Sequence, residues 1–563
     1  MFGTFSPWQL LGRNPMGTQA APVSEFDYIV VGAGSAGCVV ANRLSEHAEN
    51  KVLLLEAGPP DTDPNIHDPL ALSKVIGSAL DWKYMTEKQP FLNGRQIMSN
   101  RGKVLGGSSS INAMIYVRGN RRDYDHWNFL GNEGWAYQDV LPYFKKSERY
   151  ELGESHYHGG HGHLSVINNH NPTDVARAFM DGAVELDYDG PDWDFNGARQ
   201  ENGAGLYQYT ITPEHKRCAT SVAFLDTVRS RKNLTILTGA QATRVLVQSG
   251  AATGIEYAQN GTTQKAMAAK EIILSAGVYA SPQLLMLSGI GPAEHLKAMG
   301  IPVQADLPGV GQNLHDHLVT ATVFQLKQPV SNPATIAEAG LFVRTKSGVS
   351  KRPPDLQYHF QAGVTDYTDP NFKLDPTKVV FAGVMIKPYS RGQVTLRSSN
   401  PFDPPVIDPR YLQTDAEMQT LIQSIVLARE LANTSAMSKL IAAEIFPSQA
   451  FPDLSQYIRN SVQTLWHPVG TCKMGLDPQS VVDPRLRIYG VDHLRVADAS
   501  IMPTITSGNT NAACIMIGEK AADMIRGPEE TRRKRWQTSS AEQANGQASA
   551  SGPSAQAAHP PSP

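Results

Sequence analysis

The stretch FDYIVVGAGSAGCVVANRLSE, residues 26–46, joins an apolar run to a helix-like run through three spaced glycines. Residues 26–31 are mostly apolar and β-branched, which is typical of a strand buried on both faces of a parallel sheet. Gly32, Gly34 and Gly37 follow in the spacing G-x-G-x-x-G, which allows a tight turn, close approach of backbone N–H groups to a pyrophosphate, and close helix–strand packing. The stretch predicts an α/β protein with a Rossmann-like nucleotide-binding domain.

A second apolar run, KVLLLEAG at residues 51–58, strengthens this interpretation. It ends in Glu56, about 20 residues after the glycines, where an acidic side chain can accept a hydrogen bond from a ribose hydroxyl. A carboxylate at this position repels a 2′-phosphate, so the sequence disfavours NADP. FAD and NAD both remain open from these two stretches alone.

Size and composition exclude several other classes of protein. A chain of 563 residues is too long for one hydrophobic core, so we expect at least two domains. The formal net charge of −3 gives no electrostatic reason to bind nucleic acid or an acidic membrane. No C-x-x-C pair occurs, which argues against a zinc ribbon, an iron–sulfur framework or a disulfide-rich secreted fold. The four cysteines are therefore expected to be buried thiols of a cytoplasmic protein, at Cys38, Cys218, Cys472 and Cys514.

Four further stretches resemble the glucose–methanol–choline (GMC) oxidoreductases. They are RGKVLGGSSSINAMIYVRGNRRDYDHW (101–127), SAGVYASPQLLMLSGIG (275–291), LPGVGQNLHDH (307–317), and the C-terminal pair WHPVGTCKMG and ADASIMPTITSGNTNAACIMIGEKAADMI. The resemblance runs in order from about Phe26 to Arg526, which is nearly the whole folded chain. Within the family, the chain is similar to bacterial choline dehydrogenases and FAD-dependent alcohol dehydrogenases.

The resemblance implies an FAD enzyme of two domains. We expect the main part of the FAD-binding domain at 25–324, and an α+β substrate-binding domain with a mixed or antiparallel sheet and helices at 325–460. Residues 461–527 would return to the first domain. Residues 1–24 and the Ser/Ala/Gln/Pro-rich 528–563 would be a disordered leader and tail. Whether Met1 or Met16 is the true start stays open.

The same resemblance implies a set of cofactor-binding residues. The ADP half of FAD would be held by Gly32, Gly34, Ser35, Ala36, Gly37 and Glu56. The flavin would be lined by Trp82, Val104, Gly107, Asn112, Ala113 and Met114. The adenine would touch Val245. The residues closing over the pyrophosphate and the isoalloxazine would be Asp498, Asn509 and Thr510.

FAD is expected to be bound non-covalently. Choline oxidases of this family that tether FAD covalently carry a histidine where this chain has Ile111, in SSSIN. An isoleucine side chain cannot form that bond.

The resemblance also implies a catalytic pair, with His467 as the base near flavin N5 and Asn511 as the second active-site residue. Alcohol oxidation removes a hydroxyl proton while a hydride leaves the carbon atom. An unperturbed imidazole, with a pKa of about 6.5, suits a base that works near neutral pH. An amide can donate a hydrogen bond to the developing alkoxide and stay neutral. Asn511 could also cap a helix, and the two roles are compatible.

Two histidine-containing stretches could suggest a metal site. ESHYHGGHGHL (154–164) holds four histidines, at His156, His158, His161 and His163. Zinc sites usually converge from two elements, and related GMC chains keep a similar loop without a metal. We therefore expect no metal there, nor at HDH (315–317).

The combined expectation is FAD-dependent oxidation of a primary alcohol to an aldehyde. Choline, oxidised to betaine aldehyde, is the nearest alternative substrate, and its quaternary ammonium would need an aromatic box. Candidate residues for such a box are Tyr358, Phe360 and Phe381. A GMC oxidase using O2, a GMC lyase or photodecarboxylase, and a catalytically silent flavoprotein are less favoured. The alcohol, the electron acceptor (a quinone, another carrier or O2) and the oligomeric state stay open.

Contact with a membrane also stays open. No apolar run reaches the ~18–20 residues that span a bilayer. The charged run RGPEETRRKRW (526–536) could contact anionic lipid, so peripheral attachment to the inner membrane is an alternative to a free cytoplasmic protein.

Overall fold

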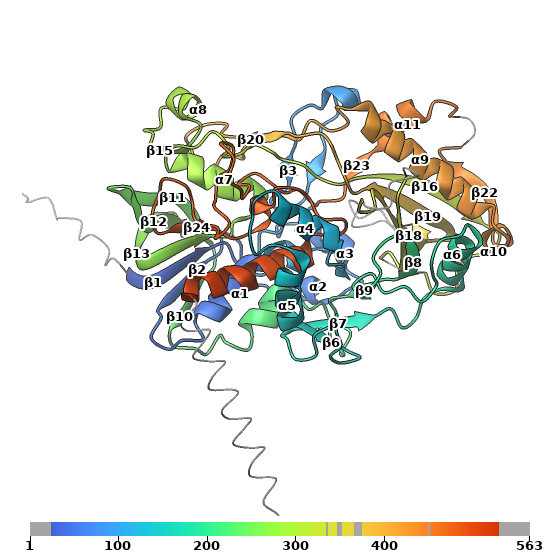
Figure 1. The fold of residues 1–563 in the computed structure, drawn as a ribbon, viewed down its shortest axis with the longest axis horizontal. Coiled ribbons are helices and arrows are strands. Elements are labelled where there is room, and N and C mark those ends of the chain that lie inside the picture. Colours follow the sequence, from blue (N-terminus) through green and yellow to red (C-terminus); the bar gives the residue numbers. More distant parts are fainter. Residues whose placement is uncertain (1–23, 334–335, 346–351, 365–373, 449–450, 528–563) are drawn as a thin grey trace, which may run out of the picture.

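The computed structural model describes residues 24–333, 336–345, 352–364, 374–448 and 451–527. The expected disordered tail, almost all of the expected leader and most of the charged run at 526–536 therefore lie outside the described residues. Figure 1 shows two lobes, one built on the strands around β1 and the other on the strands around β18.

The first sheet is centred on the strand predicted from the opening stretch. Strand β1 (Ser24–Val31) lies parallel to both its neighbours, in the order β10-β2-β1-β13-β12-β11, and β24 also pairs with β13. Ile29, Val30 and Val31 of β1 are buried on both faces, which is why the run lacks polar alternation. The other strands are β2 (Val52–Leu55), β10 (Leu234–Leu237), β11 (Ala240–Gln248), β12 (Ala251–Gln259), β13 (Thr262–Leu274) and β24 (Leu494–Val496). The prediction of a Rossmann-like α/β domain is confirmed.

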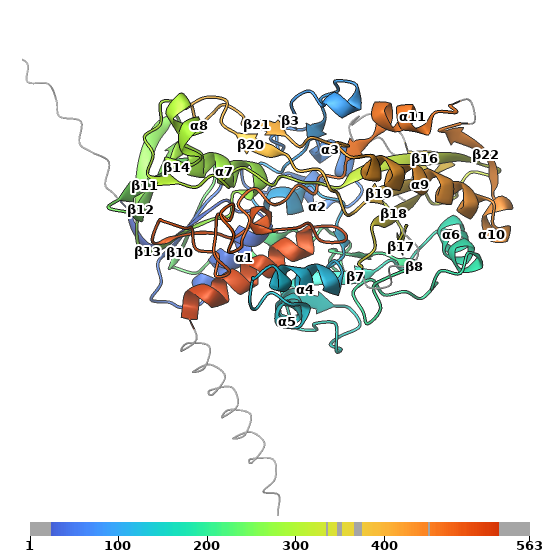
Figure 2. The same cartoon turned by 45° about the horizontal axis from the view of Figure 1, so that its top comes forward.

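Helix α1 (Ser35–Leu44) follows the glycine turn, and the last described helix, over residues 511–527, packs against it. A Cβ on Gly518 would lie 2.7 Å from the Ala36 carbonyl oxygen, so the two helices touch through bare backbone. Arg43 donates two hydrogen bonds, of 2.8 and 2.7 Å, to the buried carboxylate of Glu519. Figure 2 shows this C-terminal helix, in red, beside α1. The end of the chain therefore completes the first domain.

The second sheet is antiparallel, with the order β22-β16-β19-β18-β17-β8, and β23 also pairs with β16. Its strands are β8 (Gly203–Leu206), β16 (Leu318–Leu326), β17 (Ala339–Val343), β18 (Leu356–Val364), β19 (Asp375–Met385), β22 (Ile441–Phe446) and β23 (Gln463–Thr464). Strands β8 and β16 come from the part of the chain expected to belong to the FAD-binding domain. The boundary expected between residues 324 and 325 falls inside β16, because the chain crosses between the lobes several times.

Helices α6 (Asp174–Glu185) and α9 (Asp415–Ala432) pack on this second sheet. Tyr358, Phe360 and Phe381 lie in the core beneath them, each fully buried, and Phe360 stacks on Phe179 at 4.4 Å between ring centroids. Tyr358 also donates its hydroxyl hydrogen to the Ser424 carbonyl oxygen. The three aromatic residues proposed for a choline box are therefore core residues of the substrate lobe.

Shorter elements connect the two sheets. The helices are α2 (Pro64–His67), α3 (Leu72–Val75), α4 (Arg121–Phe129), α5 (Tyr137–Ser147), α7 (Gly277–Leu287), α8 (Ala293–Ala298), α10 (Ser435–Ser438) and α11 (Leu454–Ser461). The strands are β3 (Tyr84–Met85), β4 (Met98–Ser99), β5 (Ile115–Tyr116), β6 (Glu148–Tyr150), β7 (Leu164–Asn168), β9 (Gln208–Tyr209), β14 (Ile290–Gly291), β15 (Ala305–Asp306), β20 (Gln393–Thr395) and β21 (Val406–Asp408).

The histidine-rich loop has a structural ion-pair cluster. His158 is buried, with Nδ1 3.0 Å from Glu148 Oε1 and Nε2 2.9 Å from Asp194 Oδ2. Arg118 donates to the other oxygen of Glu148 at 2.7 Å. Burial lowers the pKa of His158, but its hydrogen bonds to the two carboxylates outweigh this and raise it. His161, in contrast, is 89% exposed.

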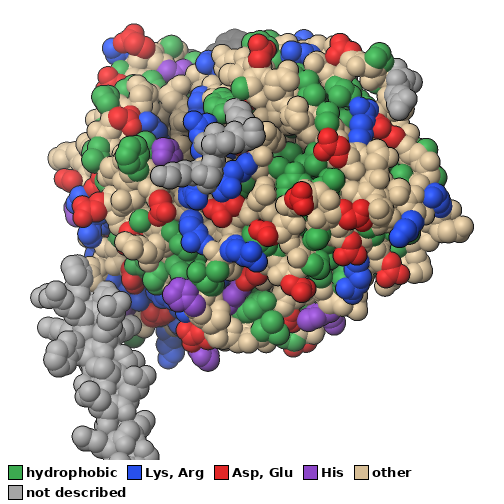
Figure 3. Space-filling model, turned by 45° about the vertical axis from the view of Figure 1, so that its right-hand side comes forward, with side chains coloured by type: hydrophobic (Ala, Val, Ile, Leu, Met, Phe, Trp, Pro, Cys, Tyr) green, Lys and Arg blue, Asp and Glu red, His purple; other side chains and the backbone are tan. Residues whose placement is uncertain are grey.

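Within the described ranges, no group of three or more His, Cys, Asp or Glu side chains is arranged to hold a metal ion. None of the helices placed there combines the length and the apolar character that crossing a bilayer requires. Figure 3 shows acidic and basic side chains interspersed over one face, in keeping with the small net charge.

Candidate active site

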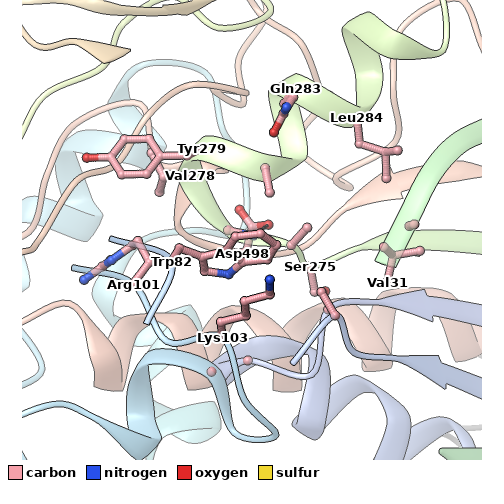
Figure 4. A pocket seen from close by; sticks show the side chains of 18 of the residues that line it. Val31, Trp82, Arg101, Lys103, Ser275, Val278, Tyr279, Gln283, Leu284 and Asp498 are labelled. Atoms are coloured by element: carbon pink, nitrogen blue, oxygen red, sulfur yellow. Dashed lines mark hydrogen bonds between the residues drawn. The ribbon is translucent and has the colours of Figure 1, made fainter. Parts of the chain in front are cut away.

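A cavity of about 400 Å³ opens at the carboxyl end of β1, where ligands of parallel sheets bind. Its walls come from segments far apart in the sequence: the loop after β1, residues 101–108, the start of α7, and Asp498. In Figure 4, Gln283 and Leu284 of α7 lie above the cavity and Lys103 lies below it. The cavity therefore exists only when the chain has folded from both ends.

The loop after β1 has the shape that a pyrophosphate requires. A Cβ on Gly34 would meet no protein atom within 4 Å, although the residue lines the cavity. The N-terminus of α1 faces the same space, and its unpaired N–H groups and partial positive charge attract an anion. A Cβ on Gly107, on the facing loop, would lie 2.7 Å from the Gly34 Cα, so the two loops meet through glycine. The bare backbone fits a dinucleotide phosphate.

Glu56 and Asp498 line the cavity and hold its backbone in place. Glu56 accepts hydrogen bonds from the backbone N–H groups of Ala33, at 2.9 Å, and Gly58, at 2.8 Å. Burial raises the pKa of Glu56 to about 7. Asp498 accepts from the Gly277 N–H at 2.9 Å at the start of α7. Each oxygen of Glu56 accepts one of these two bonds, so Glu56 can still accept a bond from a ribose hydroxyl.

Two basic side chains that sequence reasoning missed also line the cavity. Lys103 Nζ lies 4.4 Å from the centroid of the Trp82 ring. Arg101 donates to the Trp466 carbonyl oxygen at 2.5 Å, which joins the cavity wall to the segment carrying His467. Both residues belong to the stretch RGKVLGG, whose positive charge next to a glycine turn was the available signal. They give the cavity a positive wall that suits an anionic cofactor.

The predicted cofactor residues divide into two groups. Those that line the cavity are Gly32, Gly34, Ser35, Ala36, Glu56, Trp82, Gly107 and Asp498. Those that do not line it are Gly37, Val104, Asn112, Ala113, Met114, Val245, Asn509 and Thr510. Gly37 packs against the turn that precedes α1 and does not face the cavity. A Cβ on Gly37 would lie 1.9 Å from the Gly32 carbonyl oxygen. Asn112 accepts bonds from Met114 N–H and Arg217, so its side chain stabilises a turn.

Val245, which the resemblance places against the adenine, does not line the cavity. Its N–H donates to Ser288 Oγ at 2.8 Å, while Ala240, Gln241 and Ala242 of the same strand line the cavity. The pairing of β11 with β12 shifts register between Ala242 and Arg244. Strand β11 is therefore irregular beside the cavity, and the contact of Val245 with the adenine stays a prediction.

His467 lies next to the cavity wall with Asn509, not Asn511, beside its ring. Asn509 Nδ2 is 3.3 Å from His467 Nε2. The side-chain oxygen of Asn511, Oδ1, instead accepts a 2.7 Å hydrogen bond from Ser35 Oγ, at the start of α1. The predicted partner of His467 is therefore corrected to Asn509. Asn511 begins the last helix, and its side chain faces α1, whereas Asn509 precedes that helix and faces the histidine.

Sequence reasoning also missed His317, in the stretch HDH. Its Nδ1 lies 3.1 Å from His467 Nδ1, and the two rings meet edge to face at 84°. The intervening Asp316 accepts the backbone N–H of His467 at 2.9 Å. The pairing of β16 with β23 brings the two histidines together, and no feature of the sequence indicates that pairing.

The environment of His467 differs from the one assumed from the sequence. Burial, followed by the charges of His317, His359 and Arg101, lowers its pKa well below 6.5. The prediction of an unperturbed imidazole is therefore wrong. An imidazole with this depressed pKa is neutral at physiological pH and keeps a lone pair available as a base.

Proteins similar to this chain are known over most of its length. The chain matches the N-terminal part of the GMC oxidoreductase family over residues 26–319 and its C-terminal part over residues 388–518. It is 41% identical to an oxygen-dependent choline dehydrogenase of Citrobacter koseri, covering 90% of this chain and 96% of that protein. It is also 41% identical to an alcohol dehydrogenase [acceptor] of Pseudomonas putida, covering 89% and 95%. The crystal structure of pyridoxine 4-oxidase from Mesorbium loti has a TM-score of 0.81 at 33% identity, covering 88% and 98%.

Gly34→Ala should separate cofactor binding from folding. Because the new methyl group meets no protein atom, the apoprotein should keep its thermal midpoint. The methyl group would enter the space for the pyrophosphate and weaken FAD binding at least about tenfold, which corresponds to ~1.4 kcal/mol. Fluorescence titration of the apoprotein with FAD measures this change.

Gly37→Ala is the matched control for that variant. Its Cβ would lie 1.9 Å from a backbone oxygen, so α1 must move and stability should fall by about 1–3 kcal/mol or more. Equal effects of the two variants on thermal midpoint and on FAD affinity would contradict the assignment of Gly34 to the phosphate.

Proposed function

This chain belongs to the GMC oxidoreductase family, and from that premise we propose that it oxidises a primary alcohol to an aldehyde, with bound FAD as the hydride acceptor. His467 is the base and Asn509 is the orienting donor. The observation that carries this proposal is the 3.3 Å contact between Asn509 Nδ2 and His467 Nε2, beside the wall of the nucleotide cavity. Ser35, which lines the cavity, is bonded to the same C-terminal segment through Asn511.

The chemistry assigned to the pair follows from its atoms. Neutral His467 can accept the hydroxyl proton of the alcohol at Nε2. Asn509 Nδ2, which points at that nitrogen, can donate to the alcohol oxygen as negative charge develops there. The substrate hydroxyl would then stand between the two side chains and replace their direct contact. His467 and Asn509 are only half-buried, so a substrate can reach both side chains.

We favour a neutral alcohol over choline as the substrate. Of the three groups that lower the pKa of His467, His317 and His359 are neutral at physiological pH because burial lowers their own pKa values. Arg101 is therefore the positive charge among them. The carboxylate of Asp316 lies close by, but its Oδ2 is occupied by Tyr411 and Thr464 and its Oδ1 by backbone N–H groups. A quaternary ammonium ion gains nothing from such surroundings. The similarity to relatives named choline dehydrogenases makes choline the second candidate.

We also propose that FAD is bound non-covalently. Ile111 is buried in an apolar cluster with Val104 and Met114, and its side chain has no atom that can bond to the flavin. The cavity wall of bare backbone and two basic side chains supports retention by contact alone.

The substrate proposal is tested by mixing the oxidised protein anaerobically with alcohols in a stopped-flow spectrometer. The second-order rate of flavin bleaching should be at least about tenfold higher with a neutral aliphatic or benzylic primary alcohol than with choline, because repulsion of the cation costs about 1.4 kcal/mol or more. Reoxidation by O2 or by a quinone analogue then identifies the acceptor. Faster bleaching by choline would reverse the assignment, and no bleaching by any alcohol would favour a lyase or photodecarboxylase.

The roles of the two asparagines are tested by substitution. His467→Ala should lower the rate of flavin reduction about 10²–10⁴-fold, and Asn509→Ala about 10²–10³-fold. Asn511→Ala is the matched control, because it releases Ser35 and should weaken FAD binding while the loaded enzyme keeps its reduction rate. A larger loss of rate in Asn511→Ala than in Asn509→Ala would restore the original pairing.

The depressed pKa of His467 predicts a flat pH profile in the same assay. The base works in its neutral form, which is lost only when the pH falls through the folded pKa. Since that pKa lies well below 6.5, the reduction rate should stay constant between about pH 8 and pH 6. A decline with a midpoint near pH 6.5 would contradict the assigned environment.

The attachment of FAD is tested by acid precipitation. All flavin absorbance should appear in the supernatant, since no covalent bond retains it. Flavin that stays with the precipitated protein would show a covalent link.

A further inference from the structure

The proposed reaction assigns no role to His317, although this residue contacts the base. It immediately precedes β16 and is fully buried, with Nδ1 3.1 Å from His467 Nδ1. Two imidazole nitrogens at this distance share one hydrogen, so one ring donates and the other accepts. Which ring donates determines the tautomer of His467, and therefore whether its Nε2 can act as a base.

The contact of His467 with Asn509, on the other side of the His467 ring, determines which of the two histidines donates. Asn509 Nδ2 is an amide nitrogen that can only donate, and it lies 3.3 Å from His467 Nε2. His467 Nε2 must therefore accept, and the neutral ring carries its hydrogen on Nδ1. It follows that His467 Nδ1–H donates to Nδ1 of His317, which carries its own hydrogen on Nε2.

The surroundings keep both rings neutral, as this arrangement requires. Burial, with the charges of Lys387, His315 and His359, lowers the pKa of His317 well below 6.5. Its Nε2 has no partner at hydrogen-bond geometry among the described residues. The Ile386 backbone raises the pKa of His317 by less than burial lowers it. A proton on Nδ1 of His317 would have to displace the one donated by His467.

The backbone holds the two rings at this distance. One oxygen of Asp316 accepts the N–H groups of both His317, at 2.8 Å, and His467, at 2.9 Å. The Leu465 N–H donates to the His317 carbonyl oxygen at 2.9 Å, alongside the pairing of β16 with β23. The pair therefore spans the joint between the substrate sheet and the C-terminal segment.

We infer that His317 is a positioning residue that holds His467 in the tautomer with its hydrogen on Nδ1 and its lone pair on Nε2. The inference rests on the proposed role of His467 as the base. In the alternative tautomer, Nε2–H would point at the substrate oxygen and no lone pair would face the hydroxyl group. When the alcohol proton reaches Nε2, the Nδ1–H···Nδ1 bond becomes charge-assisted and stabilises the imidazolium.

Two substitutions of His317 separate this role from packing. His317→Asn keeps an acceptor oxygen near the position of Nδ1, whereas His317→Leu has a similar size and no acceptor. Anaerobic flavin reduction should slow about 10²-fold or more in His317→Leu and stay within about tenfold of the wild type in His317→Asn. The substrate dissociation constant and the FAD content should be unchanged in both variants. Equal losses in the two variants, or a loss in His317→Leu below about threefold, would overturn the inference.

His315→Asn is the matched control in the same turn. His315 is buried, accepts the Ile505 N–H at Nε2, and has its Nδ1 next to the Asn313 carbonyl oxygen, away from His467. This variant should lower the thermal midpoint and leave the reduction rate of the loaded enzyme unchanged. A rate loss equal to that of His317→Leu would mean that disturbance of the turn explains both, and would overturn the inference.

A readout without turnover is available from ¹⁵N-histidine NMR. The His467 signals, identified by their loss in His467→Ala, should show a protonated Nδ1 in the wild type and in His317→Asn, and a tautomer mixture in His317→Leu. A protonated Nε2 in the wild type would overturn the inference. Failure of the proposed function would look different, because His467→Ala itself would then keep its reduction rate.

Discussion

Gly37 lies so close to the preceding turn that a Cβ on it would stand 1.9 Å from the Gly32 carbonyl oxygen. This contact of backbone with backbone sets the direction of α1 and points its N-terminus into the cavity. The last helix then packs on α1 through Gly518 and through the paired side chains of Arg43 and Glu519. That packing brings Asn511, at the start of the last helix, into contact with Ser35 of the cavity wall. The geometry of the site therefore depends on one position where only glycine fits.

The second lobe contributes the remaining part of the site through Asp316. Its carboxylate accepts hydrogen bonds from two backbone segments and from the side chains of Tyr411 and Thr464. A buried carboxylate with this many donors is held in one position. Through these backbone bonds, the carboxylate places His317 next to His467, and it makes no hydrogen bond to either imidazole ring. The second lobe thus positions the base, while its own aromatic core lies elsewhere.

The sequence predicted the path of the backbone better than the direction of individual side chains. The glycine spacing and buried β1 determined the first domain, because only one backbone path satisfies them. Asn511 was predicted in place of Asn509 because both residues lie in GNTN. Their spacing does not indicate which side chain precedes the helix and faces His467. Val245 lies in a strand whose register is irregular, and its contact with the adenine, which the resemblance implies, stays a prediction. The depressed pKa of His467 required knowledge of its burial, which one sequence segment does not contain.

The hydrogen bond between Ser35 and Asn511 joins residues 476 positions apart. A ribosome adds about 5–20 residues per second, so roughly 25 to 95 seconds separate the emergence of its two ends. During that interval the glycine turn has been synthesised but lacks the segment that completes the cavity. The nascent chain must keep β1 and its apolar neighbours from aggregating without help from the cofactor. This contact can therefore form only after nearly the whole chain has been synthesised.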